Sequence, residues 1–148
     1  MTEFAVQARQ EKREAAERAG IDEALVSDLV ERFYQRVREH PTLGPVFDAH
    51  VDDWPKHLGR MKDFWGAIAI ESGRYRGNPM LKHAALPEAR RGHFADWLGL
   101  WHETVHELAP SEQVANFFTS RADRISESLQ MGIAMHRDGQ APGTPLRA

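Results

Sequence analysis

The chain has 148 residues, of which 41% are hydrophobic and 28% charged, and this composition fits one globular domain with a buried core. The formal net charge is −3 and basic residues are interleaved with acidic ones, which argues against binding to nucleic acid. There is no cysteine, so disulfides, thiolate catalysis and cysteine-ligated metals are excluded, and any metal must be held by nitrogen or oxygen. No apolar run approaches the roughly 20 residues that span a bilayer, so we expect a cytoplasmic protein without a membrane segment.

Residues 1–20 favour a helix but offer almost no apolar stripe, so we expect a solvated N-terminal extension or a frayed helix. From Ile21 to Val37, hydrophobic residues recur at helical spacing, which predicts a helix that ends near Pro41. Asp22 and Ser27 are both possible N-caps, so two short helices in series are an alternative. We expect residues 41–47 to form a turn-rich connection.

The next helix begins at Trp54, after two acidic residues, and its hydrophobic residues continue at steps of three and four to Ile68. A short helix opens at Asn78-Pro79 and has Met80 and His83 on its inner face. Pro110 ends a further helix, and residues 111–114 open the last one. Residues 139–148 have the composition of a flexible tail. Because no segment alternates like a strand, the predicted fold class is all-α.

Two histidines, His57 and His83, share faces with the hydrophobic residues of two different helices. The aromatic residues supply more flat apolar surface than a small helical core needs; they are Phe33, Phe47, Trp54, Phe64, Trp65 and Trp97. Aromatic walls, one nitrogen ligand and polar groups on the opposite side are what a planar macrocycle with a central metal requires. Either histidine alone is more often a core or surface residue, so the hypothesis of a bound haem depends on the combination.

The chain also contains His102-Glu103-Thr-Val-His106, a literal H-E-x-x-H pattern on a predicted helix. Two histidines one turn apart can hold Zn²⁺ with the glutamate as base, and Glu127 is a conceivable third ligand. However, His102 and His106 each follow a core residue, so they lie at the polar margin of the helix. A zinc hydrolase is therefore a distant alternative.

Several blocks of sequence resemble the group III (P-type) truncated haemoglobins in order and spacing, over roughly residues 24–135. The most specific blocks are Tyr75-Arg-Gly-Asn-Pro-Met80 followed by His83, and Phe94-Ala-Asp-Trp97-Leu98. The other matching blocks are residues 33–38, 43–47, 54–57, 64–65 and 82–83. The resemblance implies a two-over-two helical sandwich around one b-type haem. The truncated globin domain would comprise residues 21–138, between the extension (1–20) and the tail (139–148).

Residue by residue, the resemblance implies that His83 is the proximal iron ligand and that Tyr34, His57 and Trp97 line the distal side of the haem. His57 is also a possible sixth iron ligand in the resting protein. The remaining positions expected to contact the cofactor are Phe33, Phe47, Trp54, Arg60, Met61, Phe64, Trp65, Tyr75 and Met80. Among these, Arg60 and Tyr75, together with Arg76, are expected near the haem propionates.

A neutral His83 imidazole would leave the sixth iron position open to O₂, NO, CO or peroxide. Tyr34, His57 and Trp97 can each donate a hydrogen bond to a ligand that gains negative charge. Such a site should release O₂ slowly, which suits redox or detoxification chemistry of O₂, NO or peroxide better than O₂ transport. An NO dioxygenase or peroxidase-like activity would need an external electron-donor reductase, because the sequence contains no flavin or nicotinamide motif. A haem-based ligand sensor is the alternative function.

Overall fold

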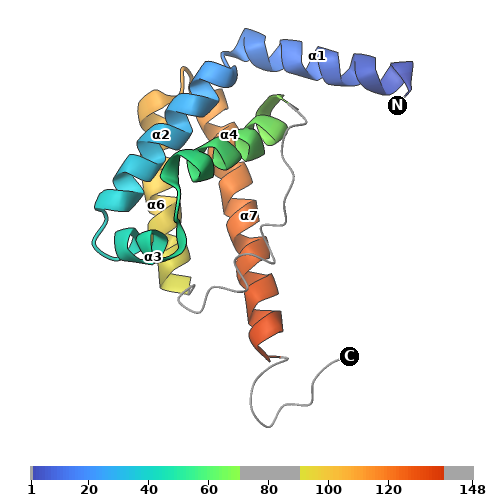
Figure 1. Ribbon diagram of the computed structural model, residues 1–148. Helices are drawn as coiled ribbons and strands as arrows, with labels where there is room; N and C mark the ends of the chain where they lie inside the picture. Colours follow the sequence, from blue (N-terminus) through green and yellow to red (C-terminus); the bar gives the residue numbers. More distant parts are fainter. Residues whose placement is uncertain (1, 71–90, 139–148) are drawn as a thin grey trace.

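The computed structural model describes residues 2–70 and 91–138, and all regular secondary structure in these ranges is helical (Figure 1). The helices are α1 (Glu3–Ala19), α2 (Glu23–Glu39), α3 (Leu43–His50), α4 (Trp54–Ile70), α6 (Arg91–Leu108) and α7 (Glu112–Asp138). The predicted all-α class is confirmed. Within the described ranges, every helix is too short or too polar to cross a lipid bilayer.

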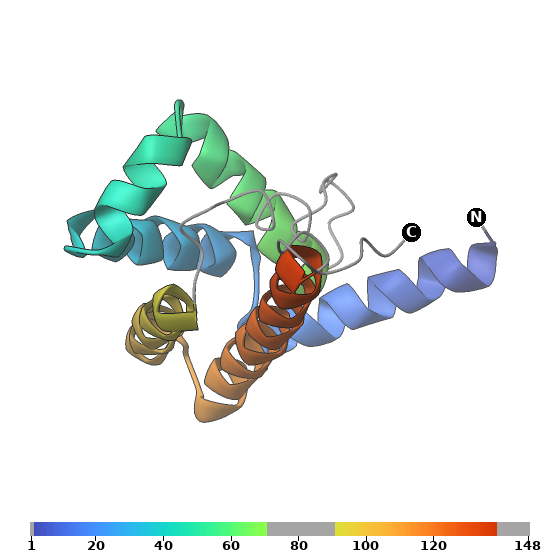
Figure 2. The same ribbon diagram turned by 90° about the horizontal axis from the view of Figure 1, so that it is seen from below.

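The helices pack as two pairs, which is the expected two-over-two arrangement. Helix α2 pairs with α4, helix α6 pairs with α7, and α2 joins the two pairs by packing on α6 (Figures 1 and 2). Helix α3 packs mainly against α2 and also touches α6. The core therefore lies where α2, α4, α6 and α7 converge, and α2 is the central element.

Helix α2 is one continuous helix, so the alternative of two short helices in series is wrong. The Asp22 carboxylate caps its N-terminus by accepting a hydrogen bond from the Leu25 N–H at 2.8 Å, which leaves Ser27 inside the first turns. A broad buried face follows, comprising Val26, Leu29, Val30, Phe33, Tyr34 and Val37. The helix ends at Glu39, as Pro41 predicts, because the residue before a proline disfavours the helical conformation.

The expectation of a turn-rich connection over residues 41–47 is wrong, because helix α3 begins at Leu43. Pro45 is the third residue of this helix and lies in its first turn. A backbone N–H there has no partner within the helix, so proline is tolerated. The His40 imidazole Nδ1 accepts hydrogen bonds from the N–H groups of Thr42 and Leu43 and so orders the link from α2.

The sequence signals for the other helix ends are confirmed. The Asp53 carboxylate accepts a hydrogen bond from the Lys56 N–H at 3.1 Å at the start of α4. Helix α6 stops two residues before Pro110, and the Ser111 hydroxyl accepts from the Val114 N–H at 3.2 Å at the start of α7. Helix α6 starts at Arg91.

Helix α1 has no buried residue and extends to one side of the other helices (Figure 2). It ends at Ala19 and is capped by Gly20, which adopts a φ of 98° that favours glycine. It contacts the body of the protein through a hydrogen bond of 3.2 Å from the Arg13 guanidinium to the carbonyl of Ile70, at the end of α4. A helix without an apolar stripe is thus ordered mainly by its C-terminal half.

Candidate functional site

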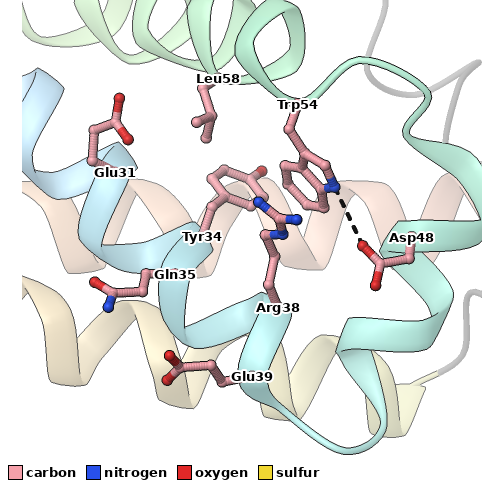
Figure 3. A pocket seen from close by; sticks show the side chains of 8 residues that line it. All are labelled: Glu31, Tyr34, Gln35, Arg38, Glu39, Asp48, Trp54 and Leu58. Carbon is pink, nitrogen blue, oxygen red and sulfur yellow. Dashed lines mark hydrogen bonds between the residues drawn. The ribbon is translucent and has the colours of Figure 1, made fainter.

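Tyr34 is the polar centre of an aromatic cluster built by three helices. Its side chain is only 6% exposed on α2 and packs edge-on against Phe47 of α3, with ring centroids 5.8 Å apart. It also contacts two residues of α4: Trp54, at 5.9 Å (Figure 3), and His57, at 5.0 Å. Burial raises the pKa of the Tyr34 phenol well above its ordinary value near 10, so the hydroxyl keeps its proton and remains a hydrogen-bond donor.

His57 lies one helical turn into α4, on the face predicted from the sequence. Its half-buried ring stands perpendicular to that of Tyr34, at an interplanar angle of 87°, and contacts Trp54 at 5.6 Å and Phe47 at 6.3 Å. An imidazole can donate or accept a hydrogen bond according to its tautomer. The cluster therefore places two polar groups, a phenol and an imidazole, within one apolar environment.

Trp97 of α6 reaches the same region from the other pair of helices. Its half-buried indole packs perpendicular to Phe33, with ring centroids 5.5 Å apart, and Phe33 in turn packs against Tyr34 at 4.8 Å. Phe33 therefore links the donors of α2 and α6. The structure brings Tyr34, His57 and Trp97 into one connected set of aromatic contacts.

The remaining aromatic pair of α4 divides between core and surface. Trp65 is buried and stacks on Trp101 of α6, with centroids 4.5 Å apart and an interplanar angle of 15°. Phe64 is half-buried and lies edge-on to Trp65 at 5.5 Å. Trp65 therefore belongs to the core. Phe64 and the half-buried Met61 keep part of their apolar surface accessible.

Comparisons with known proteins agree with this geometry. No family model matches the chain. The chain is 30% identical over 114 residues to the group 3 truncated haemoglobin of Campylobacter jejuni, an alignment that covers 74% of this chain and 89% of that protein. It is 27% identical over 111 residues to the group 2 truncated haemoglobin of Bacillus subtilis, covering 74% and 83%. The crystal structure of the group III truncated haemoglobin from Campylobacter jejuni superposes with a TM-score of 0.71 at 30% identity, covering 76% of this chain and 91% of that one.

The chain belongs to the group III truncated haemoglobins. It is accordingly a haem-binding globin, and the residues of the structure fit a haem. Apolar side chains of α3, α4 and α6 pack against the core yet keep accessible surface; they are Phe47, Trp54, Leu58, Met61, Phe64 and Trp97. Together with the buried Tyr34 donor and the His57 imidazole, they supply the flat apolar walls and the polar groups that such a macrocycle needs.

Four of the residues expected at the haem lie outside the described residues. These are Tyr75, Arg76, Met80 and His83, so the expected proximal ligand is not part of the geometry given above. Arg60 is described and is exposed on α4, about one turn beyond His57. An exposed, positively charged side chain at this point of α4 fits the expected position of Arg60 near the haem propionates.

The H-E-x-x-H pattern of this truncated haemoglobin is used in contacts between helices. The His102 imidazole Nε2 lies 2.8 Å from the Asp123 carboxylate of α7, and Glu103 lies 4.0 Å from Arg36 of α2. His106 is exposed, as predicted. No three histidine, aspartate or glutamate side chains among residues 2–70 and 91–138 are grouped to hold a metal ion.

Two residues that the sequence did not single out border the aromatic cluster of Tyr34, Phe47, Trp54 and His57, called the distal cluster below. The guanidinium of Arg38 lies over the indole of Trp54, 4.5 Å from the ring centroid, and the Asp48 carboxylate accepts a hydrogen bond of 3.2 Å from the Trp54 N–H. Arg38 follows Tyr34 by one helical turn, and this spacing could have indicated that the two share a face. Nothing in the local sequence indicates the contact of Asp48, because it depends on the angle between α3 and α4.

Proposed function

We propose that this globin binds O₂ and other diatomic ligands at an open iron site and carries out redox or detoxification chemistry of O₂, NO or peroxide, rather than O₂ transport. The observation that supports this most directly is the buried, protonated Tyr34 phenol, packed 5.0 Å from the His57 ring. When bound, haem b would supply a ferrous iron able to take up a diatomic ligand in its sixth position. His83 is proposed as the proximal ligand of that iron.

Tyr34 is proposed to hold the ligand by donating a hydrogen bond. A phenol whose pKa is raised does not ionise in the neutral or mildly alkaline range, so it presents a proton to any ligand that gains negative charge. The surrounding aromatic rings leave Tyr34 only 6% exposed, and a hydrogen bond to a charged acceptor is stronger in such a largely apolar environment. Ligand dissociation should therefore be slow at every pH at which the phenol is intact.

His57 and Trp97 are proposed as the second and third donors. The Trp97 indole can only donate, whereas His57 can also accept a proton or bind the iron as a sixth ligand. A low-spin ferric spectrum that persists in Tyr34→Phe and disappears in His57→Ala would demonstrate that sixth ligand. A spectrum that is the same in His57→Ala would restrict His57 to the donor role.

Slow release of O₂ suits chemistry on the held ligand better than delivery of O₂. Turnover of NO or peroxide consumes electrons, and we propose that a separate reductase of the cytoplasm supplies them. We further propose that residues 21–138 form the functional globin unit, with residues 1–20 as an extension and 139–148 as a tail. The polar surface of α1, which buries no residue, agrees with that division.

The first test is the visible absorption spectrum of the purified protein when oxidised, reduced with dithionite and then exposed to CO. We expect a Soret band that shifts on reduction and shifts again with CO. Protein that neither retains haem nor takes up added hemin would overturn the proposal. One equivalent of zinc in such protein would redirect attention to His102, Glu103 and His106.

The second test measures O₂ dissociation by stopped flow in Tyr34→Phe and Trp97→Phe. Loss of a hydrogen bond to a charged acceptor should accelerate dissociation roughly tenfold or more for Tyr34→Phe. Trp101→Phe is the matched control, because its indole N–H donates to the carbonyl of Phe118 at 3.1 Å within the core. The donor argument fails if both distal variants release O₂ at the rate of the unaltered protein.

A further inference from the structure

A solvent-open groove of about 410 Å³ lies between α2, α3 and α4, directly outside the distal cluster (Figure 3). The buried Tyr34 and the half-buried Leu58 line it, and Arg38, Asp48 and Trp54 lie next to one another along it. The groove is wide enough for water and for diatomic molecules.

Two of the side chains that line this groove also contact His57, which is proposed to face the bound ligand. Tyr34 and Trp54 line the groove and are also the residues that contact the His57 ring, at 5.0 and 5.6 Å. The cluster offers no opening on the side of Phe33 and Trp101, which are 1% and 0% exposed. A molecule that passes between Tyr34 and Trp54 therefore arrives at His57 without crossing the core.

Trp54 is held in place by two contacts from outside the core. The Arg38 guanidinium covers its ring at 4.5 Å, and the Asp48 carboxylate accepts its indole N–H at 3.2 Å. Arg38 and Asp48 are both exposed, and contacts made by exposed groups are weak and break readily. Trp54 is also the first residue of α4, where the side chain has few helical neighbours on one side.

We propose that this groove is the passage by which O₂, NO and CO reach the distal site, and that Trp54 is its gate, held closed by Arg38 and Asp48. This inference rests on the proposed function, since it needs an iron-bound ligand behind the gate. A closed gate slows arrival and departure of the ligand by the same factor. It leaves the equilibrium affinity to the hydrogen-bond donors Tyr34, His57 and Trp97.

The test uses the haem-loaded full chain and CO, with association measured after flash photolysis and dissociation measured by displacement with NO. Arg38→Met and Asp48→Ala should each raise both rate constants by about threefold, and the double variant by about tenfold, with the dissociation constant unchanged. Arg121→Met is the matched control, because Arg121 lies over the ring of Phe117 on α7 at 4.6 Å, away from the groove. The control should leave both rate constants unaltered.

A second readout follows the gate itself rather than ligand binding. In the diamagnetic CO form, hydrogen exchange of the Trp54 indole N–H, measured by NMR, should accelerate in Arg38→Met while exchange of the buried Trp101 indole stays slow. A structural disturbance of the whole core would accelerate both. The two indoles therefore separate opening of the gate from general loosening.

Equal CO association rates in the double variant and the unaltered protein would overturn the gate. So would a rise in the dissociation rate alone, because that pattern belongs to a residue that stabilises the bound ligand, as proposed for Tyr34. If the protein bound no haem, both the proposed function and the proposed gate would be refuted. If the protein bound CO normally and both rate constants were unchanged in Arg38→Met and Asp48→Ala, only the proposed gate would be refuted.

Discussion

Gly44 occupies the point of closest approach between α3 and the end of α2. A Cβ atom added to Gly44 would lie 2.6 Å from the Arg38 carbonyl oxygen and 3.4 Å from that of Val37. Both neighbours are backbone atoms of a helix, so neither can move aside as a flexible side chain would. We therefore predict that Gly44→Ala destabilises the protein, although alanine is the better helix former.

The size of the effect follows from this geometry. Ordinary contact begins at 3.4 Å, so α3 would have to move by about 0.8 Å away from Arg38. Forced overpacking of this kind costs about 1–3 kcal/mol, and the helix preference of alanine over glycine returns at most about 1 kcal/mol. We expect a net loss of about 1–2 kcal/mol, equivalent to a fall in Tm of about 2–8 °C for a chain of this length.

Equilibrium unfolding in urea, followed by circular dichroism on the haem-loaded protein at fixed haem excess, measures this loss. Gly99→Ala is the matched control, because Gly99 is exposed in the middle of α6 and a Cβ there would have nothing within 4 Å. The control should be slightly stabilised, by about 0.5–1 kcal/mol. If Gly44→Ala is as stable as Gly99→Ala, the close approach of α3 to α2 is wrong.

Three further predictions concern the core, an ion pair and the distal phenol. Trp101→Phe should lower the free energy of unfolding by about 2–3 kcal/mol, because it leaves the Phe118 carbonyl without its donor and weakens a ring stack; urea unfolding checks this. The hydrogen bond from Arg36, with a smaller effect of Arg32, lowers the pKa of Glu107 below 4.5, so its contribution to stability is present above that pH and is lost as the pH falls through the lowered pKa. Unfolding measured from pH 6 to pH 2 should therefore show a smaller acid-induced loss in Arg36→Met than in the unaltered protein, and an equal loss in both would contradict the assignment. Because burial raises the pKa of Tyr34, the O₂ dissociation rate should be constant from about pH 7 to pH 10, and an increase with an apparent pKa near 10 would show a solvated phenol.

The sequence alone was sufficient for most helix positions. The positions of Asp22, Asp53 and Ser111 before hydrophobic runs marked three helix starts, because a side-chain oxygen at the cap satisfies backbone N–H groups that the helix cannot. The sequence-based prediction failed at α3, because residues 41–47 were expected to form a turn-rich connection. Proline breaks the interior of a helix and not its first turn, and the sequence does not mark which of the two applies.

The resemblance to the group III truncated haemoglobins also indicated the distal residues from the sequence alone. The spacing of Trp54, His57 and Met61 places them on one helical face, since residues three and four apart lie on the same side. The buried state of Tyr34 could not be predicted in this way, because a single tyrosine on a core face often leaves its hydroxyl in water. Its burial depends on Phe47 and Trp54, which approach it from two other helices.

What the sequence by itself determined is therefore the all-α class, the faces of the helices and the identity of the family. Periodicity and capping are local properties, so they can be recognised in the sequence without knowledge of the fold. Only the tertiary structure decided that Arg38 and Asp48 hold Trp54, that His102 pairs with Asp123, and that a groove ends at Tyr34. Each of these contacts joins two different helices, so it depends on crossing angles and distances that are set by packing of the whole core.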